Sequence, residues 1–203
     1  MTLRRILPRT LPFASLLLAA TAAQAHPGHP HPYDEVDEFE VPGTLEAVMH
    51  PFTGLDHLVA ALAVGCLAYA MGRKMGGFAA ALFMGVLTLG WALGRMGLAL
   101  PMLEQGLALT IIGVGVVLAL GAKTGTFVRM GLVALMAFWH GSAHGMEMPG
   151  VIPGSGLIAG TGIVVALGAM FSALTSKLSP AMPRFAGAAA ALVGLVIIVQ
   201  RLG

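Results

Sequence analysis

The chain contains little charge and only one cysteine. Charged side chains make up 10% of its 203 residues and aromatic side chains 6%, whereas hydrophobic side chains make up 57%. This balance is typical of a membrane protein and not of a soluble globular domain. Because Cys66 stands alone, an intrachain disulfide and a metal cage built from several cysteines are excluded.

Two further absences narrow the function. The sequence has no G-x4-G-K-[ST] phosphate-binding motif, so we expect no ATP-driven step within this chain. The formal net charge is only +2, which gives no indication of a nucleic-acid partner. No enzymatic activity is expected from these features.

Residues 1–25 have the pattern of a secretory signal peptide. Arg4, Arg5 and Arg9 form a basic start, an apolar run follows from Leu11, and Ala23-Gln24-Ala25 is a small-residue cleavage site. Cleavage would make His26 the first residue. It would also remove three arginines and change the formal net charge from +2 to −1.

Six apolar segments follow, each close to the ~20 residues that cross a bilayer as a helix. We place them at 50–71, 76–95, 103–121, 127–146, 153–174 and 184–202. The short connections predict an all-α integral membrane protein, with six transmembrane helices in a compact bundle that forms one domain over 47–203. Residues 26–46 precede it as an external tail.

Glycine pairs at four-residue spacing occur in three of these segments. They are Gly90/Gly94, Gly141/Gly145 and Gly156/Gly160. In membrane helices this spacing indicates close helix packing, and we assign these pairs no chemistry.

The charges indicate how the chain is oriented. A cleaved signal peptide would leave the new amino end outside the cytoplasm. Only Arg95 and Arg201 of the basic residues beyond the signal then lie on the outer side, as the positive-inside rule requires. We therefore expect a multi-pass protein of the bacterial inner membrane with both termini in the periplasm. The basic residues in or beside the cytoplasmic loops are Arg73, Lys74, Lys123, Arg129, Lys177 and Arg184.

All histidines and acidic residues belong to the outer side in this topology. Several of them lie within apolar helices, where an ionisable side chain costs roughly 2.5–3.5 kcal/mol on insertion scales. His140, His144 and Glu147 share one face of a helix over two turns. Histidines four residues apart can hold one divalent ion, and the carboxylate one turn later can add charge or orient a ligand. Hydrogen bonding between helices is the alternative reading of these residues.

A second polar cluster, "MHPFTGLDHL", opens the first segment. His50 and His57 are seven residues apart, about 10 Å along a continuous helix, which is too far to share an ion. Pro51 and Gly54 make a break plausible, and a break would let His50 fold back. Adjacent Asp56 and His57 point about 100° apart, so we expect one of them to be a direct ligand and its neighbour to orient that ligand or form a relay. A helix-start signal, with Asp56 facing the helix dipole, is the alternative.

The tail sequence "HPGHPHPYDEVDEFE" adds His26, His29 and His31. Its prolines prevent helix formation and its acidic residues attract cations. We interpret these histidines as an accessory site that captures metal ions, with a plain solvated linker as the alternative.

At these clusters the chain resembles a known family. "HPFTGLDH" fits the His-x5-Asp-His motif and "WHGSAHGME" fits the His-Gly-x-Ala-His-Gly-x-Glu motif of the HupE/UreJ nickel/cobalt secondary permeases, and the resemblance covers essentially the whole chain. Trp139 stands where the family usually has phenylalanine. The resemblance implies transport of Ni²⁺, with Co²⁺ as an alternative, for hydrogenase or urease maturation. It also implies that transport depends on His50, Asp56, His57, His140, His144 and Glu147.

The chemistry of the side chains leaves other functions open. Imidazole and carboxylate bind nickel, cobalt, zinc and copper(II) alike. Copper(I) is a further candidate because Met49, Met146 and Met148 flank the clusters, although methionine is commonly apolar filling. An intramembrane zinc hydrolase with Ser142 or water as the nucleophile would use similar ligands, but the H-E-x-x-H arrangement is missing. A metal chaperone or receptor is the third class, and a homo-oligomer is left open.

Overall fold

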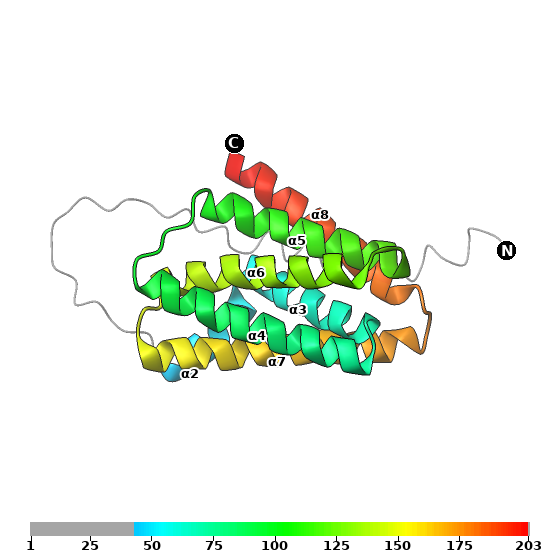
Figure 1. Cartoon of the computed structure of the whole chain (residues 1–203), viewed down its shortest axis with the longest axis horizontal. Coiled ribbons are helices and arrows are strands. Elements are labelled where there is room, and N and C mark those ends of the chain that lie inside the picture. The colour runs from blue at the N-terminus through cyan, green and yellow to red at the C-terminus, as the bar shows by residue number, and fades with distance from the viewer. Residues whose placement is uncertain (1–42, 203) are drawn as a thin grey trace, which may run out of the picture. The chain divides into compact units, whose positions relative to one another are not determined.

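The structure, a computed structural model, describes residues 43–202, and helices account for most of them. No strand is present in this part of the chain (Figure 1). The expected signal peptide and the tail histidines His26, His29 and His31 lie outside the described residues. The helices are α2 (Thr44–Thr53), α3 (Leu55–Ala70), α4 (Arg73–Arg95), α5 (Leu103–Leu120), α6 (Thr126–Glu147), α7 (Val151–Ser176) and α8 (Met182–Leu202), with a 3-10 turn, η2 (Gly121–Lys123), after α5.

The helices show a multi-pass membrane protein, but they do not confirm six crossings. Within residues 43–202, four helices are long and apolar enough to cross a membrane, namely α4, α5, α7 and α8, and the bent pair α2–α3 makes a fifth if it counts as one span. The 22-residue helix α6 is not among them. It is long enough, but it carries Arg129, His140, His144 and Glu147, which lower its apolar character.

The first expected segment, 50–71, is not one helix. It is divided between α2 and α3, which meet at Gly54 with a bend of 79°. Gly54 has an extended backbone, with φ −85° and ψ 122°. Pro51 lies inside α2, so it does not begin a helix, and it has no N–H to donate to the preceding turn. The break between His50 and His57, which the sequence left open, is therefore present.

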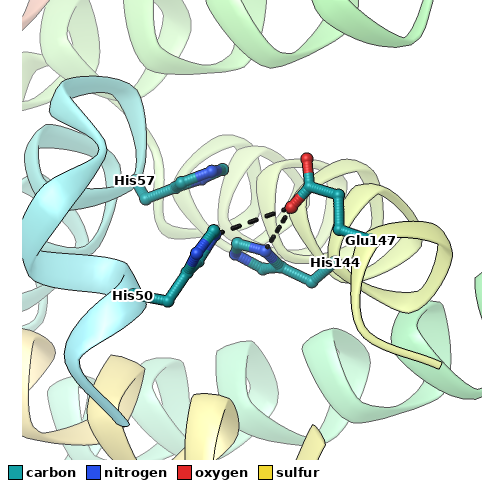
Figure 2. A group of neighbouring side chains, drawn as sticks. All are labelled: His50, His57, His144 and Glu147. Carbon is teal, nitrogen blue, oxygen red and sulfur yellow. Dashed lines mark hydrogen bonds and ion pairs between the residues drawn. The ribbon is translucent and has the colours of Figure 1, made fainter. Parts of the chain in front are cut away.

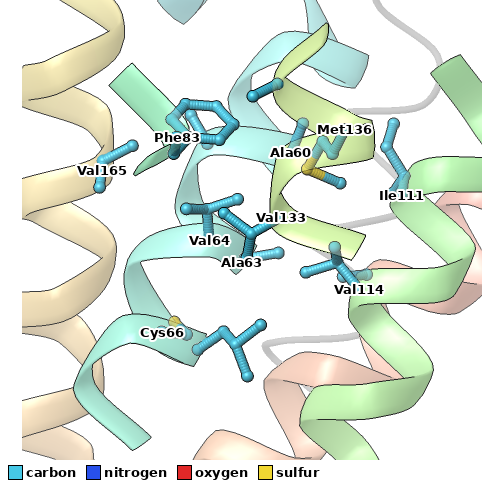
Figure 3. Packing of buried hydrophobic residues seen from close by; sticks show 14 of the residues in the cluster. Ala60, Ala63, Val64, Cys66, Phe83, Ile111, Val114, Val133, Met136 and Val165 are labelled. Carbon is cyan, nitrogen blue, oxygen red and sulfur yellow. The ribbon is translucent and has the colours of Figure 1, made fainter. Parts of the chain in front are cut away.

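The packing places α4 against α6, α5 against α8, and both α2 and α3 against α7. The core contains fully buried Val64, Phe83, Ile111 and Val133 from four different helices (Figure 3). In a bilayer such packing holds helices together mainly by van der Waals contact, since lipid is as apolar as the side chains.

The glycine pairs lie at the closest helix contacts, as their spacing predicted. A Cβ atom on Gly141 or Gly145 of α6 would overlap the carbonyl oxygen of Leu87 or Trp91 on α4. Gly94 faces back in the same way, toward the backbone of Ser142. Because one face of α6 lies so close to α4, the neighbouring histidines of α6 are turned toward α2 and α3.

Gly156 and Gly160 of α7 make a similar close contact, in this case with α2. A Cβ on Gly160 would overlap the carbonyl oxygen of Val48, and a Cβ on Gly156 would lie 3.0 Å from that of Thr44. Helix α2 therefore lies directly on the backbone of α7. This contact fixes the position of the helix that carries His50.

Candidate metal centre

Four side chains from three helices converge at one place. His50 comes from α2, His57 from α3, and His144 and Glu147 from α6. Each offers one ligand atom, and these atoms all lie within 4.8 Å of one another. Figure 2 shows the three rings and the carboxylate pointing toward a common centre. The break at Gly54 allows the side chains of His50 and His57 to reach the same place.

The carboxylate of Glu147 lies between two of the rings. Its Oε2 is 3.3 Å from Nδ1 of His144 and 3.6 Å from Nε2 of His50. The ring centroids of His57 and His144 are 4.3 Å apart, and that of His50 is 5.2 Å from each of them. Three imidazoles and one carboxylate are thus close neighbours, and Glu147 pairs with two of the rings.

These distances are close to those that one metal ion requires. Imidazole and carboxylate bind first-row divalent ions at roughly 2.0–2.2 Å, so two ligands on opposite sides of an ion lie about 4.2 Å apart. Since no two of the four ligand atoms lie more than 4.8 Å apart, an approach of at most about 0.6 Å would bring any two of them within that distance.

The four side chains differ in how far they are exposed to solvent. The side chain of Glu147 is 49% exposed and that of His50 is 26% exposed, whereas those of His57 and His144 are 10% and 2% exposed. Glu147 and His50 are therefore the members of the group nearest to water. His57 and His144 are enclosed by the protein.

His140 lies beside the four residues and is not one of them. Its Nδ1 lies 3.0 Å from the carbonyl oxygen of Met136, and since a carbonyl can only accept, Nδ1 is the donor. The opposite nitrogen, Nε2, is then an acceptor, and it is buried without a hydrogen-bond partner among the described residues. The ring centroid of His140 is 5.9 Å from that of His57.

Asp56 also lies next to the group. Its Oδ1 accepts a hydrogen bond of 2.9 Å from the backbone N–H of His57 and is 3.8 Å from Nε2 of that residue. Of the adjacent pair, His57 therefore faces the other ligands, and Asp56 adds negative charge beside it. Sequence spacing alone did not decide between them.

Two helix carboxyl ends add negative potential to the group, whereas the amino end of α3, which begins at Leu55 two residues before His57, adds positive potential. Helix α6 ends at Glu147 and α2 ends at Thr53, three residues after His50. The carbonyl end of a helix carries a partial negative charge, which favours a cation. A helix broken within the membrane, with helix ends near an ion, is an arrangement found in secondary transporters.

Trp91 supports the site and was not predicted. Its indole Nε1 donates a 2.9 Å hydrogen bond to the carbonyl oxygen of Met148, directly after Glu147. The guanidinium carbon of Arg95 lies 4.9 Å from the centre of the Trp91 ring. A buried tryptophan needs a partner for its N–H, but no local pattern in the sequence indicates which residue that partner is.

The methionines near the site have different surroundings. Met148 is buried and packs with Ala47 and Leu157. Met49 and Met146 are 46% and 47% exposed. The packing of Met148 is that of an apolar core residue, which leaves only the two exposed methionines for the copper interpretation.

The fold and the site define a class of protein: a multi-pass helical membrane protein with a histidine and carboxylate cluster at the break of one helix and the end of another. The model of the family described as "HupE / UreJ protein" matches residues 14–197. The chain is 38% identical over 162 residues to Protein HupE of Rhizobium leguminosarum bv. viciae, an alignment that covers 77% of this chain and 85% of that protein. The chain therefore belongs to the HupE/UreJ family. No solved structure matches it.

Proposed function

We propose that this protein is a secondary transporter that carries a divalent transition metal ion, nickel first among the candidates, into the cytoplasm. The HupE/UreJ family is linked to nickel and cobalt uptake for hydrogenase and urease. The observation that supports a metal as cargo is the convergence of His50, His57, His144 and Glu147 within 4.8 Å. Two segments that are far apart in the sequence form this group.

The exposure of the ligands supports a route for the ion. Glu147 and His50, at the exposed side, would take up the hydrated ion. His57 and His144 would then replace its water, while the charges of Asp56 and Glu147 offset the two charges of the ion. His140, whose Nε2 is buried and has no hydrogen-bond partner within residues 43–202, would contribute from beside His57.

The membrane potential supplies enough free energy for this movement. Two charges that move inward across 100 mV gain about 4.6 kcal/mol, more than three tenfold steps in concentration. The proposal therefore needs no nucleotide hydrolysis. It places the metal centre at the periplasmic face and the basic loops in the cytoplasm, as the positive-inside rule predicts.

The choice of metal rests on the family. Three imidazoles and a carboxylate suit nickel, cobalt, zinc and copper(II), so the ligands do not distinguish these ions. Membership of the HupE/UreJ family favours nickel and cobalt. It does not favour the intramembrane zinc hydrolase as an alternative function.

Radiolabelled nickel uptake tests the proposal. Cells that express the protein should accumulate nickel faster than cells without it, and unlabelled cobalt should compete more strongly than manganese, copper or zinc. Equal uptake with and without the protein would contradict transport of nickel. Strong competition by copper or zinc alone would move the assignment to that metal.

Site variants test whether the four ligands act as one unit. We expect His57→Ala and His144→Ala each to abolish uptake at an unchanged level of protein in the membrane. The double variant should be no worse than either single one, because residues that bind one ion are not additive. Normal uptake in either single variant would exclude a shared site.

Two Glu→Gln variants, one in the site and one outside it, test whether uptake depends on the charge of Glu147. Glu147→Gln keeps the shape of the side chain but removes its charge from the site, so uptake should fall at least about tenfold. Glu104→Gln makes the same change at the start of α5, where the carboxylate pairs with Arg201. That variant should transport at close to the wild-type rate.

A further inference from the structure

A groove at the opposite end of the molecule has no part in the proposed transport site. It has a volume of about 860 Å³ and lies between the end of α3, the start of α4 and the middle of α7. Small apolar residues form most of its wall, among them Ala68, Gly77, Ala81, Ala166 and Ala169. A Cβ on Gly77 would meet no atom within 4 Å, so the groove is open at this point.

The mouth of the groove is basic. Arg73 lines it together with Tyr69, and Lys74 is the next residue along α4. Both basic residues are exposed, and neither forms an ion pair within residues 43–202. The acidic residues of this part of the chain lie toward the other end of the bundle, namely Glu46, Asp56, Glu104 and Glu147.

We propose that this groove binds an anionic phospholipid, with an acyl chain along the Ala/Gly wall and the headgroup phosphate on Arg73 and Lys74. An apolar groove lined by Arg73, with Lys74 next to it in the chain and neither in an ion pair within residues 43–202, is complementary to a molecule with an apolar chain and an anionic head. Arginine pairs with phosphate through two parallel hydrogen bonds. Tyr69 lies at the mouth, and tyrosines are common at the depth of lipid headgroups. Basic pockets between helices on the cytoplasmic side are suited to anionic headgroups.

The charge at the mouth favours a lipid over a helix from a second copy. Small residues also permit close contact between helices, so a dimer through this face is the alternative. In a symmetric dimer within a membrane both copies have the same orientation, and the same patch faces itself. Arg73 and Lys74 of the two copies would then meet at one depth, and this repulsion opposes the dimer.

Native mass spectrometry of the purified full chain tests this proposal. The protein would be titrated with phosphatidylglycerol and, separately, with phosphatidylcholine of the same acyl chains. We expect one tightly held lipid and a preference for phosphatidylglycerol of at least about tenfold, since charged hydrogen bonds of this kind are strong. Arg73→Gln with Lys74→Gln should remove the preference and leave weak binding of both lipids.

Two leucine substitutions, one inside the groove and one outside it, test whether the lipid binds in the groove. Gly77→Leu should fill the groove and remove the bound lipid whatever its headgroup. Gly131→Leu is the matched control, because a Cβ on this exposed glycine of α6 also meets no atom within 4 Å and it lies outside the groove. Equal lipid binding by the two variants would overturn the proposal. A dimer that Gly77→Leu dissociates without changing the lipid count would assign the groove to a second copy instead. Both results are independent of metal uptake.

Discussion

At Gly54 the absence of a side chain leaves room for the ring of His57. A Cβ atom there would lie 2.6 Å from Cδ2 of His57 and 3.1 Å from Oδ1 of Asp56. The backbone of Gly54, with φ −85° and ψ 122°, is one that any residue adopts. A substitution would therefore act on the two side chains and not on the bend itself.

This geometry gives a prediction for a residue that binds no metal. Gly54→Ala should lower the rate of nickel uptake at least about tenfold, because a 1 Å displacement of a site residue is costly. Uptake is measured with tracer, and the amount of protein in the membrane by immunoblot. Gly43→Ala is the control, since a Cβ there meets no atom within 4 Å. Wild-type uptake by Gly54→Ala would show that the ring of His57 does not need its present position.

The sequence predicted which side chains belong to the polar clusters, but not how they are grouped. Helical spacing placed His140, His144 and Glu147 on one face, yet Nδ1 of His140 bonds the carbonyl oxygen of Met136, which spacing does not reveal. The grouping of His50 with His57 depends on the angle of the break. Pro51 and Gly54 signalled a break, but local sequence does not give its angle of 79°.

The contact between α4 and α6 determines where His144 and Glu147 lie. Gly145→Val would bring a side chain against the carbonyl oxygen of Trp91, and the two helices would have to separate. We expect a loss of stability of about 1–3 kcal/mol, seen as a lower midpoint of thermal unfolding in detergent and less protein in the membrane. Gly131→Val on the same helix should change neither, because a Cβ there meets no atom within 4 Å. An unchanged midpoint in Gly145→Val would contradict this account of the contact.

Sequence predicted the helices best where apolar runs end abruptly. The segment expected at 103–121 is Leu103–Leu120, and that expected at 184–202 is Met182–Leu202. Helix α6 was also located correctly, at Thr126–Glu147, although it lacks the apolar character of a membrane span. The role of Trp91 depends on a contact with Met148 across 57 positions, and no local pattern contains that information.

For the whole molecule, the distribution of charge predicts its orientation. In a background with buried Cys66 replaced by alanine, a cysteine at exposed Val151, near the metal centre, should react with a membrane-impermeant maleimide in intact cells. A cysteine at exposed Leu178, beside the basic loops, should react only after the cells are permeabilised. The reverse pattern would contradict the proposed topology and the inward direction of transport.

Deletion of part of the amino-terminal tail should change nickel uptake only when nickel is scarce. If His26, His29 and His31 collect metal ions for the centre, deletion of residues 27–40 should raise the apparent KM for nickel and leave the maximal rate almost unchanged. The measurement is tracer uptake over a range of nickel concentrations. Unchanged uptake at submicromolar nickel would identify the tail as a linker.

The four residues of the candidate metal centre come from two distant parts of the sequence, so they are synthesised at different times. His57 leaves the ribosome well before His144, and at ~5–20 residues per second the interval is on the order of ten seconds. During that time α2 and α3 are complete, but two of the four ligands in the group of His50, His57, His144 and Glu147 have not been synthesised. A nascent chain therefore has only half of the group, and the four side chains can come together only after α6 has been synthesised.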